Sequence, residues 1–169
     1  MSEEKPKTAL ERKAREWIKE RGVTLKDIGE LVYYLQSPYQ KSLTLEKCIK
    51  HVDRVLSKRE VQNAVITGIQ LDVLAEQGKL ESPLQETIFT DEGLYGIDEI
   101  IALSIVNVYG SIGFTNYGYI DKQKPGILKD LNDRSTGKCN TFLDDIIGAI
   151  AASASSRLAH SLANDEDVD

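Results

Sequence analysis

The side chains best suited to chemistry are carboxylates, which gather in the second half of the chain around two apolar segments. Asp98 and Glu99 directly precede the run IIALSIVNVYG, and Asp144 and Asp145 directly precede IIGAIAASASS. Consecutive helix positions differ in direction by about 100°, so one acid of each pair can face inward while the other faces sideways. Two such helix starts brought together would converge several carboxylate oxygens.

Other polar residues surround these pairs. Asp91 lies seven residues before Asp98, and Asp121, Lys124 and Arg134 precede the second pair. Carboxylate oxygens suit Mg²⁺, which usually keeps several waters and is completed by a substrate phosphate. A bound metal of this kind can polarise a phosphoryl oxygen and activate water, while Lys124 would hold the phosphate as a point charge.

A simpler interpretation of the paired acids stays open at this stage. Acids in the first turn of a helix complement its dipole, which contributes roughly 0.3–1 kcal/mol each. Against this, acids that begin a buried helix carry a desolvation cost unless they are paired or bound to a metal. Spacing alone does not decide between the two interpretations.

The elements that must position these acids are predicted to be helices. Capping patterns and helical spacing of apolar residues predict helices that begin after Thr8, Thr24, Thr44, Ser57 and Ser82, with stops near Gly22, Pro38, Leu56 and Gly78. The two segments after the acid pairs are apolar or small on nearly all sides, which is typical of buried helices. No stretch alternates with period two. The sequence therefore predicts one all-α domain over residues 1–169, with frayed polar ends at about 1–7 and 164–169, in which amphipathic helices surround two apolar central helices.

Composition narrows the function classes. The 169 residues carry a net charge of −6, which argues against binding to nucleic acid. The first residues, MSEEKPKTALERK, lack the apolar core of a secretory signal, and no apolar run approaches the roughly 20 residues of a membrane span. With only two cysteines and no disulfide framework, we expect a soluble cytoplasmic protein.

Three motifs of the acid-rich half resemble those of the phosphatidylglycerophosphatase A family. These are DEGLYGIDEIIA at residues 91–102, YGYIDKQKP at 117–125 and DRSTGKCNTFLDDIIGA at 133–149. Each is weak alone, but their shared order is fairly specific. The chain resembles a soluble set of relatives, which includes the low-temperature-requirement C type of Gram-positive bacteria, more than it resembles the membrane-embedded members.

The resemblance implies an Mg²⁺-dependent phosphatase of phospholipid biosynthesis, which hydrolyses the phosphomonoester of phosphatidylglycerophosphate or a related phosphate ester. It makes Asp91, Asp98, Asp121 and Asp144 candidate catalytic residues, Lys124 and Arg134 candidate substrate contacts, and Asp98, Glu99, Asp144 and Asp145 candidate metal ligands.

An alternative function is a non-catalytic helical protein with a structural or regulatory divalent-cation site, because residues 1–90 contain no counterpart of the family's Pro-Gly-Thr-type motif. Two kinds of contact are further hypotheses. The amphipathic segment with Arg12, Trp17 and Ile18 is a candidate for peripheral membrane contact, with packing against the bundle as its alternative. A homo-oligomer is also left open.

Overall fold

The computed structural model describes residues 6–166, with side chains as far as Leu162, and the regular structure of this range is helical with no strand. The helices are α1 (Ala9–Glu20), α2 (Leu25–Gln36), α3 (Leu45–Leu56), α4 (Arg59–Glu76), α5 (Leu84–Phe89), α6 (Ile97–Val106), α7 (Ser111–Gln123), α8 (Ile127–Leu131) and α9 (Leu143–Glu166), with a 3₁₀ turn at Arg134–Thr136. The predicted all-α class is confirmed. Of the predicted frayed ends, residues 1–5 and 167–169 lie outside the described range, whereas residues 164–166 belong to α9.

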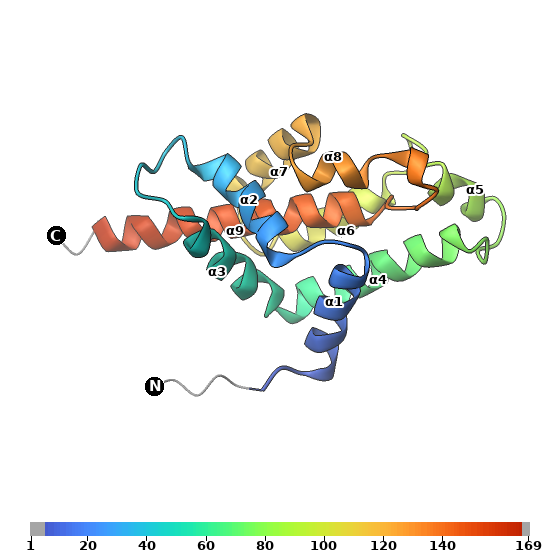
Figure 1. The fold of residues 1–169 in the computed structure, drawn as a ribbon, viewed down its shortest axis with the longest axis horizontal. Coiled ribbons are helices and arrows are strands. Elements are labelled where there is room, and N and C mark those ends of the chain that lie inside the picture. The colour runs from blue at the N-terminus through green and yellow to red at the C-terminus, as the bar shows by residue number, and fades with distance from the viewer. Residues whose placement is uncertain (1–5, 167–169) are drawn as a thin grey trace.

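Helix α9 is the axis of the bundle. In Figure 1 it runs through the middle of the molecule, with α2, α7 and α8 on one side and α1, α3 and α4 on the other. Residues 149–155 of α9, except for the one at 150, are alanines or serines, and all seven are fully buried. Small side chains allow neighbouring helices to approach α9 from every direction, so this predicted central helix is found at the centre.

Local capping explains where several helices begin. The hydroxyls of Thr8, Thr24 and Thr44 each accept a hydrogen bond from the backbone amide three residues later. The cap predicted at Ser57 is wrong, because Lys58 occupies the N-cap position of α4 and Ser57 instead ends α3, where its hydroxyl donates to the carbonyl of Arg54. The connection between α3 and α4 is too short for Ser57 to serve both helices.

The N-terminal helix α1 follows the packing interpretation. It lies against α4, and Ala14 and Ile18 on its apolar side are buried. Arg15 is turned toward neighbouring acids, Glu11 at 2.9 Å and Asp53 at 2.8 Å. The buried side of α1 is thus used by the bundle, whereas Trp17 is only partly buried.

Helix α6 differs from its predicted position inside the bundle. Ala102, Ile105 and Val106 are buried against α4 and α9, but Ile97 and Ile100 on the other side are 48% and 60% exposed. An apolar composition on all sides indicates burial only if neighbours cover all sides, and the described elements cover α6 on one side.

Candidate active site

A polar hollow of about 150 Å³ lies where α6, α7 and α9 come together. It is lined by Asp91, Glu92, Gly93, Asp98, Glu99, Asp121, Lys124, Asn132, Asp144 and Asp145. The three motifs each contribute, so segments up to 54 positions apart in the chain meet in one place. All six acids singled out from the sequence line this hollow, and so does Lys124.

Each wall of the hollow is a helix end or an adjoining loop. Asp98 and Glu99 lie in the first turn of α6, and Asp144 and Asp145 in the first turn of α9. Asp121 lies in the last turn of α7. Asp98 is buried while Glu99 is exposed, which is the arrangement expected of each pair. The second pair differs from that expectation, since both of its acids are buried because α9 is covered on all sides.

Lys124 links two of the motifs electrostatically. Its ammonium lies 2.8 Å from the Asp121 carboxylate and 3.2 Å from the Asp144 carboxylate. Burial disfavours the charge of this lysine, but the carboxylates of Asp144 and Asp121 outweigh that effect and raise the pKa of Lys124. The lysine is therefore a fixed cation at neutral pH, on the wall of a hollow lined by acids.

Two residues that line the hollow have an unusual backbone conformation. Within residues 6–166, the non-glycine residues with positive φ are Asp91 at 52° and Lys124 at 46°. Aspartate tolerates this left-handed region, whereas a lysine there costs on the order of 1 kcal/mol. Strained residues of this kind cluster at functional sites, where the surrounding structure holds them in place.

Three carboxyl groups of the hollow have pKa values above the ordinary value of an aspartate. Burial, followed by the carboxylates of Asp144 and Asp98, raises the pKa of Asp145. Burial also raises the pKa of Asp144 although Lys124 opposes it, and burial together with Asp98 raises that of Asp91. A cation bound among these groups would relieve their repulsion and restore their charge.

A buried carboxylate outside the three motifs holds the start of α9. Asp72 of α4 is fully buried and accepts hydrogen bonds from the backbone amides of Phe142, at 3.0 Å, and Leu143, at 2.9 Å. Burial outweighs these bonds and raises the pKa of Asp72 to about 8. Sequence reasoning missed Asp72, although it lies at helical spacing between buried Ile69 and Ala75, on the face where an acid is unexpected.

The ion pair of Arg21 and Glu76 fixes the loop before α9. Arg21 donates to the carbonyl of Cys139 and to the side chain of Asn140, and it pairs with Glu76 at 3.1 Å. Glu76 in turn accepts from the backbone amide of Cys139. Helices α1 and α4 thereby support the acids of α9 from outside the hollow.

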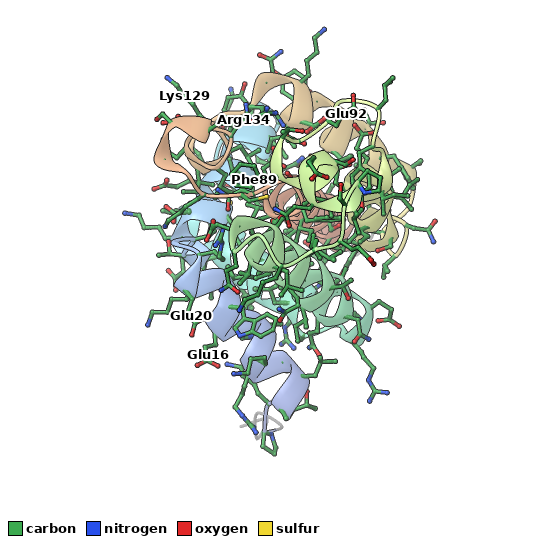
Figure 2. The ribbon with its side chains drawn as sticks, turned by 90° about the vertical axis from the view of Figure 1, so that its right-hand side faces the viewer. Glu16, Glu20, Phe89, Glu92, Lys129 and Arg134 are labelled. Atoms are coloured by element: carbon green, nitrogen blue, oxygen red, sulfur yellow. The ribbon has the colours of Figure 1, made fainter. Side chains whose placement is uncertain are left out.

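Arg134 does not line the hollow. It pairs with Asp91 at 3.2 Å, donates to the carbonyl of Thr90, and its side chain is 60% exposed. It belongs to a small neighbouring cleft that shares Asp91 and Asn132 with the hollow. Figure 2 shows Arg134 and Glu92 at the same end of the molecule, with Glu16 and Glu20 of α1 far below them.

The donor set suits a divalent cation held partly by water. No three side chains of His, Cys, Asp or Glu within the described part of the chain are close enough together to hold a metal by themselves. Mg²⁺ commonly takes only one or two carboxylates and completes its shell with waters and phosphate oxygens. The hydroxyl of Tyr117 is also buried without a hydrogen-bond partner among residues 6–166. Burial, followed by the carboxylates of Asp145 and Asp121, raises the pKa of this tyrosine.

Comparison with known families gives the assignment. The model of the family described as phosphatidylglycerophosphatase A matches residues 17–160, which include every lining residue of the hollow. The chain belongs to the phosphatidylglycerophosphatase A family. The match also extends the resemblance seen at residues 91–149 to most of the first ninety residues.

Relatives within this family are similar over nearly their whole length. The uncharacterized protein YutG of Bacillus subtilis is 66% identical over 160 residues, which are 95% of this chain and 96% of YutG. The low temperature requirement C protein from Listeria monocytogenes, whose crystal structure is known, is 66% identical, and the two structures match with a TM-score of 0.92 over 93% of this chain and 99% of that one. A protein of unknown function from Bacillus stearothermophilus is 75% identical, with a TM-score of 0.89 over 90% of this chain and 94% of that one.

The described helices also bear on membrane contact. None of the helices in residues 6–166 has the length and apolar character needed to cross a bilayer.

Proposed function

We propose that this phosphatidylglycerophosphatase A family member is an Mg²⁺-dependent phosphatase that hydrolyses the phosphomonoester of phosphatidylglycerophosphate or of a related phosphate ester. The observation that carries the proposal is the convergence of three motifs on one hollow, where Lys124 bridges Asp121 and Asp144. A hollow of about 150 Å³ has room for a phosphate group and several waters.

The residues divide into three roles in this proposal. Asp98, Glu99, Asp144 and Asp145 are the groups that would hold the metal. When bound, Mg²⁺ would polarise the phosphoryl oxygens and lower the pKa of water. Lys124 would contact a phosphate oxygen as it releases Asp144 to the metal, and Asp91 and Asp121 would move protons to and from the reacting oxygens. Arg134 would hold Asp91 in place and reach an anionic group at the rim.

The non-catalytic cation site remains the second candidate. The carboxylates of Asp91, Asp144 and Asp145 repel one another or their acidic neighbours, and a bound cation would relieve that repulsion under either function. The two functions differ only in whether a phosphate ester is turned over.

Phosphate release from short-chain phosphatidylglycerophosphate tests the proposal. We expect release by the purified protein with Mg²⁺, none with excess chelator, and none from folded Asp98→Asn or Asp144→Asn variants. Asp130→Asn is the matched control, because Asp130 is an exposed acid on α8 that does not line the hollow. Folded wild-type protein that releases no phosphate with Mg²⁺ would count against this activity.

A further inference from the structure

An exposed apolar surface borders the hollow. Leu94, in the loop before α6, is 92% exposed, and Ile97 and Ile100 on α6 are 48% and 60% exposed. Positions three apart on a helix are neighbours, so Ile97 and Ile100 share one face, and Leu94 precedes them by the same spacing. We call these three residues the Leu94 patch.

The bundle does not need this patch for its core. Ala102, Ile105 and Val106 already bury the inner side of α6 against α4 and α9. Single exposed apolar side chains are ordinary on protein surfaces, but bulky aliphatic groups gathered on one face mark interaction sites. Ile100 belongs to the apolar segment that the sequence predicts to be buried, and no element within residues 6–166 covers the patch.

The patch and the hollow are made by one segment of chain. Gly93, Asp98 and Glu99 line the hollow, and the three residues of the patch lie among them between positions 93 and 100. A lipid layer that buries the patch would therefore bring its polar surface against the acids of the hollow. This continuity is what docking of the hollow at a lipid surface requires.

We propose that the Leu94 patch enters the apolar edge of a lipid layer and so presents the hollow to phosphate groups at its surface. This inference rests on the proposed function for the identity of the phosphate ester. It also moves the candidate membrane contact from α1 to α6. In Figure 2, the exposed Glu16 and Glu20 of α1 lie far from Glu92 at the rim of the hollow.

Area and charge favour a lipid layer over a second copy of the chain. Three aliphatic side chains expose on the order of a few hundred Å², which is less than half of the roughly 800 Å² per partner in a stable interface. The exposed acids Glu92 and Glu99 flank the patch. Contact therefore depends on apolar burial, and neutral lipid should bind at least as well as anionic lipid when no divalent cation is present.

Vesicle sedimentation tests the contact without requiring turnover. We expect the wild-type chain to sediment with neutral phosphatidylcholine vesicles, and the triple variant Leu94→Gln, Ile97→Gln, Ile100→Gln to lose at least tenfold in bound fraction. Glutamine keeps helix propensity while removing the apolar surface. The control variant Tyr39→Gln, Leu84→Gln removes two exposed apolar residues that do not line the hollow, and it should bind as the wild type does. Absence of wild-type binding, or equal loss in the control, would overturn the proposal.

A split between two substrates tests the purpose of the contact. The triple variant should hydrolyse monomeric short-chain phosphatidylglycerophosphate at the wild-type rate, and the long-chain lipid in vesicles about tenfold more slowly. Equal losses on both substrates would assign the patch to the hollow itself and overturn the inference. No turnover by the wild type on either substrate would reject the proposed function, while sedimentation would still decide the inference. A wild-type dimer that the triple variant dissociates in analytical ultracentrifugation would assign the patch to a second copy.

Discussion

The carboxylate of Asp72 on α4 accepts a hydrogen bond of 2.9 Å from the backbone amide of Leu143, the first residue of α9. Leu143 directly precedes Asp144 and Asp145 in the chain, so this bond fixes the start of the helix that carries them. Because Asp72 occupies amides at the start of α9, those amides do not point freely into the hollow. The side chains of Asp144 and Asp145 thus carry the chemistry of this helix end.

Replacing Asp72 by alanine should impair both stability and catalysis. Two buried amides would lose their acceptor, at a cost of about 1–3 kcal/mol, and a chain of this size loses roughly 2–4 °C in Tm per kcal/mol. We expect kcat of Asp72→Ala to fall by more than the loss of folded protein explains. Thermal melts with parallel rate measurements check this. Asp53→Ala, which removes a partly exposed partner of Arg15, should cost less than about 1 kcal/mol and leave kcat unchanged.

Removal of the Lys124 charge should lower the rate of phosphate release more than removal of a nearby surface charge does. The Lys124→Gln variant loses the cation proposed to contact the phosphate, and we expect kcat/KM to fall on the order of 100-fold. Lys122→Gln changes an exposed lysine two positions earlier that does not line the hollow, and it should retain the wild-type rate. Similar losses in both variants would show that general charge, and not the site of Lys124, matters.

Magnesium should stabilise the folded protein through the acids of the hollow. A ligand at a hundredfold excess over its Kd raises the free energy of unfolding by about 2.7 kcal/mol. We expect Tm to rise with Mg²⁺ in the wild type and in Asp130→Asn, but not in Asp144→Asn. A rise without turnover of any phosphate ester would favour the non-catalytic cation site, and no rise in the wild type would leave the acids as helix-dipole partners only.

The metal-free protein should become less stable as pH rises. The pKa of Asp72 is raised to about 8 in the folded state, so between about pH 4 and pH 8 the folded chain keeps a proton that the unfolded chain has released. The free energy of unfolding therefore declines across that window. In chelator, Tm measured against pH should fall less steeply for Asp72→Asn than for the wild type, and parallel curves would contradict the shift.

Two glycines at helix crossings should respond oppositely to alanine. A Cβ on Gly68 of α4 would lie 2.3 Å from Cδ1 of Ile146 and 2.9 Å from Cβ of Phe142, at the start of α9. Gly68→Ala should therefore cost about 1–3 kcal/mol. At Gly148 of α9 the nearest atom would be 3.6 Å away, so Gly148→Ala should gain roughly 0.5–1 kcal/mol from helix propensity. Chemical denaturation of both variants measures the difference.

Local sequence predicts the features that depend on nearby residues. The Thr24 cap is an interaction across three positions, in which the Thr24 hydroxyl accepts from the Asp27 amide and the Asp27 carboxylate accepts from the Thr24 amide, and such contacts can be inferred without the fold. The small residues of α9 likewise indicate a helix that neighbours can approach closely. The grouping of acids in the first turns of α6 and α9 could be predicted for the same reason, although their metal and catalytic roles stay predictions.

Only the tertiary structure decided which groups from distant segments meet. Asp72 and Leu143 are 71 positions apart, and no local pattern pairs them. The apolar character of α6 was plain from sequence, but its exposed side depends on where α4 and α9 lie. Sequence by itself determined the helices and the identity of the acids, because hydrogen bonding and capping act over a few residues. Packing determined the hollow, the support from Asp72 and the open face of α6, because each arises from contacts between helices far apart in the chain.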